Sequence, residues 1–439
     1  AEALSATVIF PFVPQFVRDT GITGGNERKT GYWAGVLESV FFVAEFLSVY
    51  LWGRASDRFG RRPVLLLGPL GLAFALIGFG WSKNFGSLVV FRCAQGVFNG
   101  NIGNPHILHI PIIGGLLSNP EERWPDSFGK LQILRENPYL LPCATVGLLS
   151  LSFFFLGLVA LKESSPMILA GRKREILRIS ASTDPTLTTN LVADTPTGTY
   201  GAITVTDVST ESDEAAPLVD EELPTMRELL VPRLVVPLLN YGFFCFSQTA
   251  FQVLFPLMYS TSIENGGLGF SPYQIGITRG IWGITNTFCQ LFVAARIIRR
   301  IGAKRIYIFA FANFTICIGA YPLLNFLARR ANKVDSIVWT IVIVLYQIWR
   351  FPWPSAQLYI VSSSPRPSAL SSTNSLAQMV STVVRALAPF IASALFALSL
   401  EWNLAGGYLV YILLLAVVAA GICCSLLLSS DPKSNHPPA

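Results

Sequence analysis

Long apolar runs separated by short polar links fill most of the sequence. A helix needs about 20 apolar residues to cross a bilayer core about 30 Å thick. Candidate runs, some of them shorter than this, lie at 3–17, 31–52, 63–82, 86–104, 106–117, 138–161, 232–259, 272–295, 304–327, 336–361, 370–397 and 403–429. None alternates with the period of two that a membrane β-strand requires. The pattern therefore predicts an all-α membrane protein with twelve helices.

One polar segment divides these helices into two sets of six. Residues 162–231 are rich in Ser, Thr, Asp, Glu and Pro, and they cannot bury enough apolar surface to offset the entropy of ordering. Because the chain opens on an apolar run without an initiator Met, we expect a truncated N-terminus. The predicted domains are an N-terminal helical bundle at 1–161, a cytosolic and largely disordered linker at 162–231, a C-terminal six-helix bundle at 232–429 and a short cytosolic tail at 430–439.

The region predicted to form the fourth and fifth helices is too short for two complete membrane spans. Residues 106–117 would cover only about 18 Å as a helix. Pro105 also disfavours helix at Asn104, the residue before it. We therefore expect helices 4 and 5 to be incomplete, with a break at these two residues, because of an internal deletion or a mis-joined exon. A genuine short hairpin is the alternative.

The composition agrees with a membrane protein and argues against other classes. Only 13% of the residues are charged, against about 25% in a soluble domain. The basic residues are concentrated in 53–63, in the linker and in 296–305, which by the positive-inside rule places these segments in the cytosol. The net charge of +6 therefore does not indicate nucleic-acid binding. The seven cysteines lie in or beside apolar runs, without metal or disulfide spacing.

The sequence offers little support for catalysis or for a metal site. We find no phosphate-binding loop and no nucleophile motif in a suitable context. We therefore expect neither an enzyme nor a cofactor. His106 and His109 are three residues apart, but no Cys or carboxylate lies nearby in sequence, so we expect no metal ion there.

The stretch GRASDRFGRRP at 53–63 concentrates charge between the second and third apolar runs. A basic loop of this kind fixes the orientation of the two helices that it joins. Orientation alone would not require an aspartate or two glycines. The residues that form the pattern G-x-x-x-D-R-x-G-R-R are Gly53, Asp57, Arg58, Gly60, Arg61 and Arg62.

This pattern, together with RCAQG at 92–96 and PIIGG at 111–115, resembles motifs of the major facilitator superfamily. Within it, the chain is similar to the drug:H⁺ antiporters, in particular to a fungal branch related to plant zinc-induced-facilitator-like proteins. The resemblance covers nearly the whole chain. It implies the major facilitator fold, in which two six-helix bundles related by a pseudo-two-fold axis expose a central site to alternate sides of the membrane.

The resemblance also implies roles for individual residues. The 53–63 segment would be a conformational latch, with Asp57 facing a helix N-terminus, which carries a partial positive charge. Arg92 and Gln95 would take part in proton coupling. The remnant of the antiporter motif in helix 5 consists of Pro111, Gly114 and Gly115.

Ionisable residues inside the predicted spans should face a cavity or a partner, because a charge at the bilayer centre costs at least about 2.5–3.5 kcal/mol. Glu38 and Glu45 are seven residues apart and share one face of helix 2. We expect Glu38 first, and Glu45 second, to bind and release protons, unless they reach headgroups or water. Residues expected at a substrate cavity, with packing roles as the alternative, are Arg279, Trp282, Arg350 and Arg385.

These observations predict a proton-coupled secondary transporter, an antiporter or exporter of small organic molecules that acts as a monomer. Its partners would be the substrate, protons and the lipid bilayer. The alternatives are a non-transporting receptor or sensor on the same fold, or an inactive gene product. EAAPLV at 214–219 loosely resembles a sorting signal, so we expect a vacuolar or a plasma-membrane location.

Overall fold

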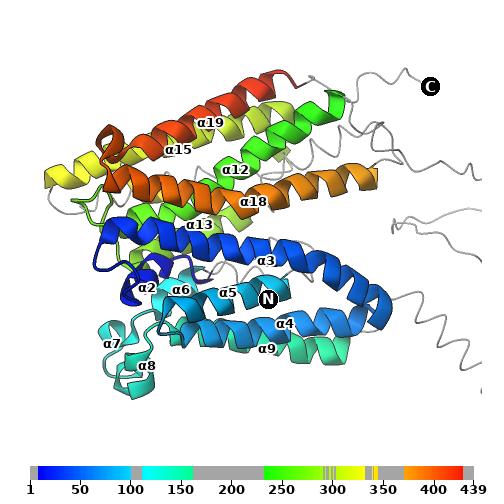
Figure 1. Ribbon diagram of the computed structural model, residues 1–439, viewed down its shortest axis with the longest axis vertical. Helices are drawn as coiled ribbons and strands as arrows, with labels where there is room; N and C mark the ends of the chain where they lie inside the picture. The colour runs from blue at the N-terminus through cyan, green and yellow to red at the C-terminus, as the bar shows by residue number, and fades with distance from the viewer. Residues whose placement is uncertain are drawn as a thin grey trace, which may run out of the picture.

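The computed structural model describes residues 8–99, 111–161, 232–289, 303–331 and 370–428, with short pieces between 292 and 344. This part of the chain is helical and contains no strand (Figure 1). The main helices of the N-terminal half are α2 (Val13–Asp19), α3 (Thr30–Phe59), α4 (Arg61–Gly80), α5 (Phe85–Asn99), α6 (Pro111–Leu117) and α9 (Leu140–Ala160). Those of the C-terminal half are α12 (Pro232–Ser260), α13 (Pro272–Cys289), α15 (Ala303–Ala331), α18 (Leu370–Glu401) and α19 (Leu409–Leu426).

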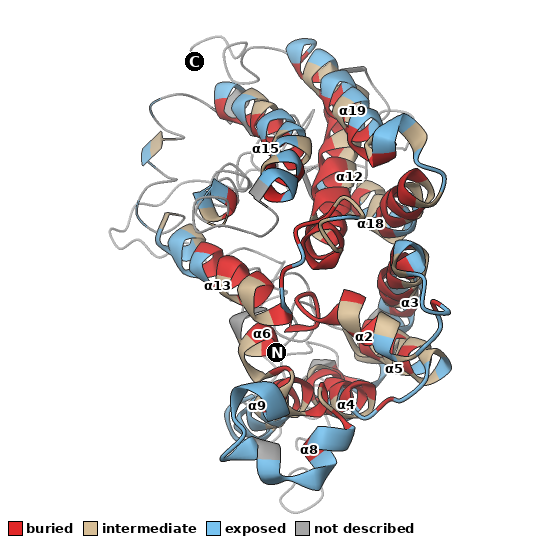
Figure 2. Ribbon diagram, turned by 90° about the vertical axis from the view of Figure 1, so that its left-hand side faces the viewer, coloured by how far each residue is buried: buried red, intermediate tan, exposed pale blue. Residues whose placement is uncertain are grey.

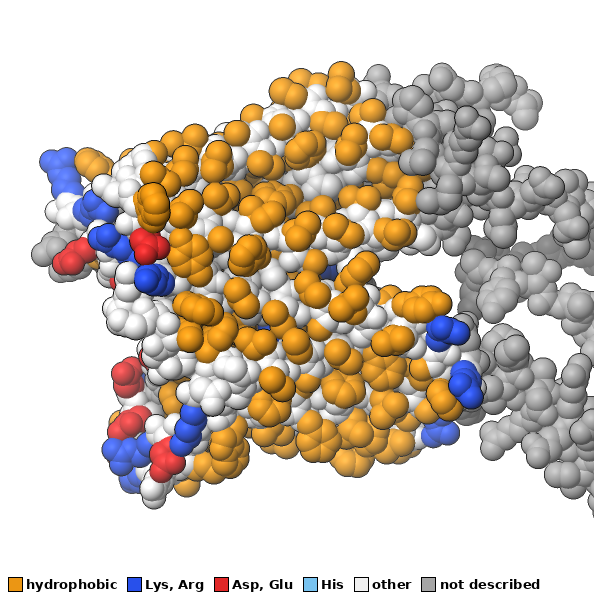
Figure 3. Space-filling view, viewed as in Figure 1, with side chains coloured by type: hydrophobic (Ala, Val, Ile, Leu, Met, Phe, Trp, Pro, Cys, Tyr) orange, Lys and Arg blue, Asp and Glu red, His pale blue; other side chains and the backbone are white. Residues whose placement is uncertain are grey.

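The surface that runs along these helices is apolar (Figure 3). Large apolar side chains that are more than half exposed include Leu47, Phe74, Leu148, Phe326 and Leu387. Soluble monomers rarely expose apolar patches of this extent, whereas a lipid-facing surface requires them. Among the described residues, seven helices are long and apolar enough to cross a membrane, namely α3, α4, α9, α12, α15, α18 and α19. The prediction of an all-α membrane protein is confirmed.

Each predicted span except 336–361 coincides, in its described part, with one of these helices. The main difference concerns the end of helix 2, which we predicted at residue 52. Instead α3 continues to Phe59, so most of the predicted 53–63 loop is helix. The turn itself is Gly60, whose φ of 98° ends α3 before α4 begins at Arg61. Glycine adopts this φ without the steric cost that a side chain would add.

The predicted defect between helices 4 and 5 falls largely outside the described residues. Helix α5 ends at Asn99 and α6 is described from Pro111. Residues 100–110, with Asn104, Pro105, His106 and His109, lie outside the described part. The described α6 has seven residues, equivalent to about 10 Å. The polar loop that follows contains the short helices α7 (Pro120–Arg123) and α8 (Gln132–Glu136). The linker 162–231, the tail 430–439 and Arg350 also lie outside the described part.

The two halves meet along a seam made by two pairs of helices. Helix α18 lies along α3, and α13 packs against α6 (Figures 1 and 2). Glycines make the close approach possible: a Cβ at Gly31 would lie 3.1 Å from Ala397 Cβ, and one at Gly115 would lie 2.6 Å from Gly276 Cα. Buried residues line this seam, whereas the outer faces are exposed (Figure 2).

The halves are in contact at one end and separated at the other. Figure 3 shows them meeting on the left, where α2 leads into α3, and parted by a notch on the right, where α3 leads into α4. We call these the α2–α3 end and the α3–α4 end. On this face, the described parts of the two halves are in contact at the α2–α3 end and separated at the α3–α4 end.

Candidate functional site

Two predicted residues form a buried ion pair. Glu38 of α3 and Arg92 of α5 are 2% and 1% exposed, and Arg92 Nη2 donates a hydrogen bond of 2.8 Å to Glu38 Oε2. Arg92 Nη1 donates a second hydrogen bond of 2.8 Å to Gln95 Oε1. Sequence reasoning selected each residue separately and did not say which carboxylate Arg92 would contact. The structure brings all three into one network.

This network is not fully satisfied. Within the described part of the chain, Glu38 Oε1, Arg92 Nε and Gln95 Nε2 have no hydrogen-bond partner. The guanidinium also lies over the ring of Phe41, 4.3 Å from its centre. A buried ion pair is stable in apolar surroundings when its remaining oxygen atoms and N–H groups also form hydrogen bonds. The buried pair therefore leaves one oxygen of Glu38 without a donor among the described residues.

Gly96 explains how α5 comes close enough to α3 for this contact. A Cβ at Gly96 would lie 2.9 Å from Ala44 Cβ and 3.1 Å from the backbone nitrogen of Glu45. The glycine of RCAQG therefore serves close helix packing. Glu45 belongs to a separate contact, because its Oε1 accepts a hydrogen bond of 3.1 Å from Asn99 Nδ2.

The 53–63 segment lies at the α3–α4 end, where the halves are parted. Arg58 is exposed and lies beside the ring of Phe59, while Arg62 Nη2 donates to the carbonyl of Leu158 at 2.8 Å. The latter contact lies within the N-terminal half. The side chains of Asp57 and Arg61 and the surroundings of Gly53 lie outside the described set. The latch role stays a prediction.

The antiporter-motif remnant lies where helices of both halves cross. Gly114 faces the backbone carbonyl of Val8, and Gly115 faces Gly276 and Pro272 of α13. The two glycines therefore allow α6 to contact the segment before α2 on one side and the C-terminal half on the other. The side chain of Pro111 is not described.

The cavity residues predicted in the second half lie near the seam. Arg279 of α13 is 3% exposed and its guanidinium lies 4.5 Å from the ring centre of Phe10 in the N-terminal half. Arg385 of α18 lies 4.8 Å from the ring centre of Phe42, also in the N-terminal half. Trp282 is buried on α13. Both arginines therefore contact the opposite half.

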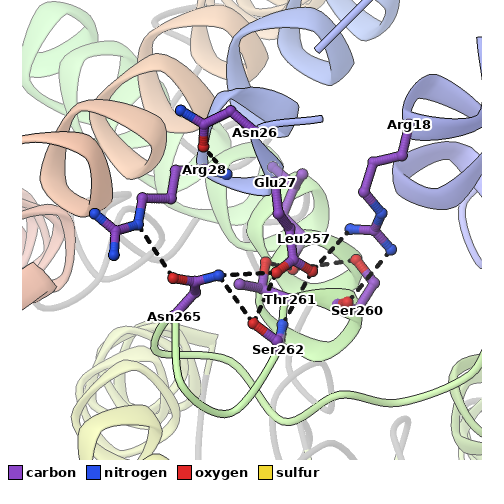
Figure 4. Close-up of polar contacts among 9 residues, drawn as sticks. All are labelled: Arg18, Asn26, Glu27, Arg28, Leu257, Ser260, Thr261, Ser262 and Asn265. Atoms are coloured by element: carbon purple, nitrogen blue, oxygen red, sulfur yellow. Dashed lines mark hydrogen bonds and ion pairs between the residues drawn. The ribbon is translucent and has the colours of Figure 1, made fainter. Parts of the chain in front are cut away.

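Sequence reasoning missed a polar cluster that joins the halves at the α2–α3 end (Figure 4). Glu27 accepts hydrogen bonds from Ser262 N at 3.1 Å, Ser262 Oγ at 2.7 Å and Asn265 Nδ2 at 3.0 Å. Arg18 Nη1 lies 3.5 Å from the same carboxylate, and Arg28 Nε donates to Asn265 Oδ1 at 3.1 Å. We call these five residues the clasp. Arg18 lies in α2, Glu27 and Arg28 lie in a short 3-10 helix at Glu27–Lys29, and Ser262 and Asn265 lie in the loop after α12. Only the charged run ERK at 27–29 hinted at their role.

Comparison with known proteins supports the class of membrane transporter that the sequence predicts. A family model described as Major Facilitator Superfamily matches residues 1–105. The transporter psiT2 of Psilocybe cyanescens is 28% identical, covering 99% of this chain and 89% of its own length. The efflux pump azaK of Aspergillus niger is 25% identical, covering 94% of this chain and 82% of its own length. Protein ZINC INDUCED FACILITATOR 1 of Arabidopsis thaliana is 23% identical, covering 96% of this chain and 88% of its own length.

The fold also has a counterpart among solved structures. The crystal structure of the human organic anion transporter MFSD10 superposes with a TM-score of 0.53 at 18% identity, covering 97% of this chain and 96% of that one. Fold and site together define a multi-pass membrane protein of two helical halves that meet at a seam. The chain is similar to members of the major facilitator superfamily, which confirms the predicted resemblance. These relatives are transporters and not enzymes, as we expected for this chain.

The alignment with psiT2 extends over 479 positions, more than the 439 residues of this chain. That relative therefore contains segments that this chain lacks. The deletion that we predict between helices 4 and 5 falls at 100–110, outside the described residues, and stays a prediction.

Proposed function

We propose that this protein is a proton-coupled antiporter that exports small organic molecules, with Glu38 as its proton site. The observation that carries the proposal is the buried Glu38–Arg92–Gln95 network with its unpartnered Glu38 oxygen. An ionisable residue inside a membrane segment is costly, and it commonly marks a proton or substrate pathway. The relative azaK is an efflux pump, which supports export, and MFSD10 is an organic anion transporter, which supports small organic compounds as substrates.

The position of Glu38 provides a route from proton binding to movement of the halves. Ser39, the next residue, accepts a hydrogen bond of 3.0 Å from the backbone N–H of Phe390 on α18. Protonation of Glu38 removes the charge that neutralises Arg92, so the α3–α5 contact must adjust. Because α3 also carries the seam with α18, this adjustment reaches the C-terminal half.

The clasp provides the gate at one end of this movement. The positive-inside rule places the 53–63 segment in the cytosol. The conformation with a notch at the α3–α4 end is then open to the cytosol, and the clasp closes the opposite side. Transport requires the clasp to open and the α3–α4 end to close in turn. We expect this cycle in a vacuolar or a plasma membrane.

Transport measurements on the full chain test the proposal. Export of a panel of small organic dyes and acids would be measured in proteoliposomes, with and without an imposed pH gradient. Wild type should respond to the gradient, and Glu38→Gln should not. Glu136→Gln, which changes an exposed carboxylate, is the matched control and should behave as wild type. An unchanged response to the gradient in Glu38→Gln would place the proton site elsewhere.

A further inference from the structure

Arg279 is a buried cation that pairs with no acidic residue in the described part of the chain. Its side chain is 3% exposed, and Nη2 donates to the backbone carbonyl of Gln252 at 3.0 Å. Its Nε has no hydrogen-bond partner, and no carboxylate lies within ion-pair distance in the described part of the chain. One carbonyl is a small share of the five N–H donors that a guanidinium carries.

The chain itself offers a comparison in Arg92. Arg92 is equally buried, but it is neutralised by Glu38 at 2.8 Å. Arg279 instead faces two aromatic rings, with Phe10 at 4.5 Å and Phe255 at 5.2 Å from ring centre to guanidinium carbon. Rings stabilise a cation but do not neutralise it. A guanidinium held in this way is ready to bind an anion.

The location of Arg279 matches a site that the moving halves would expose. It lies one turn along α13 from Gly276, the residue that Gly115 of α6 approaches at the crossing of the halves. It is seven residues from Pro272, where α13 begins at the α2–α3 end, or about 10 Å along the helix. Phe10 belongs to the N-terminal half, so separation of the halves withdraws one ring and uncovers the guanidinium.

We propose that Arg279 is the anion-binding subsite of the transport pathway and takes the carboxylate of a small organic acid. The planar guanidinium pairs with a carboxylate through two parallel N–H···O bonds. Phe10 and Phe255 pack against the apolar part of the same substrate. This assignment rests on the proposed transport function and names its substrate class. A lipid phosphate shares the anionic chemistry, and the experiment separates the two sources.

Equilibrium binding of 2-naphthoate and its neutral analogue 2-naphthamide provides the test, using the full chain in nanodiscs of zwitterionic lipid. Wild type should prefer the carboxylate by at least about tenfold. Arg279→Gln should abolish the preference while still binding 2-naphthamide, which shows that this variant is folded. Arg279→Lys, which keeps the charge, should retain part of the preference. Arg296→Gln, at an exposed position, should leave the preference unchanged.

Three outcomes overturn the inference. In the first, wild type does not prefer 2-naphthoate over 2-naphthamide, and in the second, Arg279→Gln keeps that preference. In the third, anionic lipid displaces 2-naphthoate in an Arg279-dependent way, which would assign the site to a lipid headgroup. The proposed function fails separately. Glu38→Gln should keep the preference for 2-naphthoate, so loss of pH coupling and loss of anion binding report on different residues.

Discussion

Glu38 of α3 and Arg92 of α5 form an ion pair of 2.8 Å in which both side chains are almost completely buried. The residues are 54 positions apart in the sequence, and each lies on a helix that the apolar pattern predicts. Removing one partner of a buried pair leaves an uncompensated charge, which costs more than the pair contributes. The pair therefore makes specific predictions for stability as well as for transport.

The first prediction concerns this pair. Arg92→Gln leaves Glu38 buried without its cation and should destabilise the protein by about 3–5 kcal/mol. Adding Glu38→Gln removes the remaining charge, so the double variant should be less destabilised than the sum of the single variants. Thermal unfolding in detergent measures both effects. Additive losses would show that the two residues do not interact.

The second prediction concerns the α6–α13 crossing. A Cβ at Gly115 would lie 2.6 Å from the backbone of Gly276, so Gly115→Ala should force the halves apart and cost about 1–3 kcal/mol. Gly319 of α15 provides the control, because a Cβ there would meet nothing within 4 Å. Gly319→Ala should be neutral or stabilising by about 0.5–1 kcal/mol. Equal unfolding temperatures for the two variants would contradict the close crossing.

The third prediction concerns the clasp. Glu27→Ala removes the acceptor that holds Ser262 and Asn265. Because the carboxylate is 24% exposed, we expect the free energy of clasp opening to fall by only about 1–2 kcal/mol, which is about 5–30-fold in the ratio of closed to open clasp. Spin labels at Ile22 and Trp402, both exposed, should then report longer distances. Glu121→Ala, which breaks an exposed ion pair with Arg135, should leave that distance distribution unchanged. A Glu27→Ala distribution identical to wild type would show that the clasp does not hold this end closed.

The fourth prediction concerns the 53–63 segment. Asp57→Asn removes one charge with little change in volume, so the protein should fold. Transport should fall well below wild type, because the latch that the family motif implies would lose its anion. Transport rates in proteoliposomes equal to those of wild type would refute the latch.

The sequence predicts the helices well because lipid imposes a simple requirement on them. Apolar length locates α3, α4 and α9, and charged residues within such runs point to Glu38 and Arg92. The predicted end of α3, at residue 52, was wrong for a physical reason. Charge indicates that a segment leaves the hydrocarbon, but a helix can continue into water, and Gly60 ends α3 only where its backbone turns.

Contacts between loops could not be predicted in the same way. Glu27 meets Ser262 across 235 positions, and neither residue lies in a periodic segment or a recognisable motif. Small polar residues in loops carry no signal of their partners in a single sequence. The pairing of Glu38 with Arg92 was similarly hidden, although both residues were selected, because a helix pattern gives the face of a residue and not the helix opposite it.

If Glu38 exchanges a proton for substrate, substrate binding should release a proton from the protein. Purified full-length protein in weakly buffered detergent solution would be titrated with the best substrate found in the transport panel, while a pH indicator records released protons. We expect wild type to release about one proton per bound substrate, and Glu38→Gln to release none while it still binds the substrate. The same proton release from both proteins would contradict it.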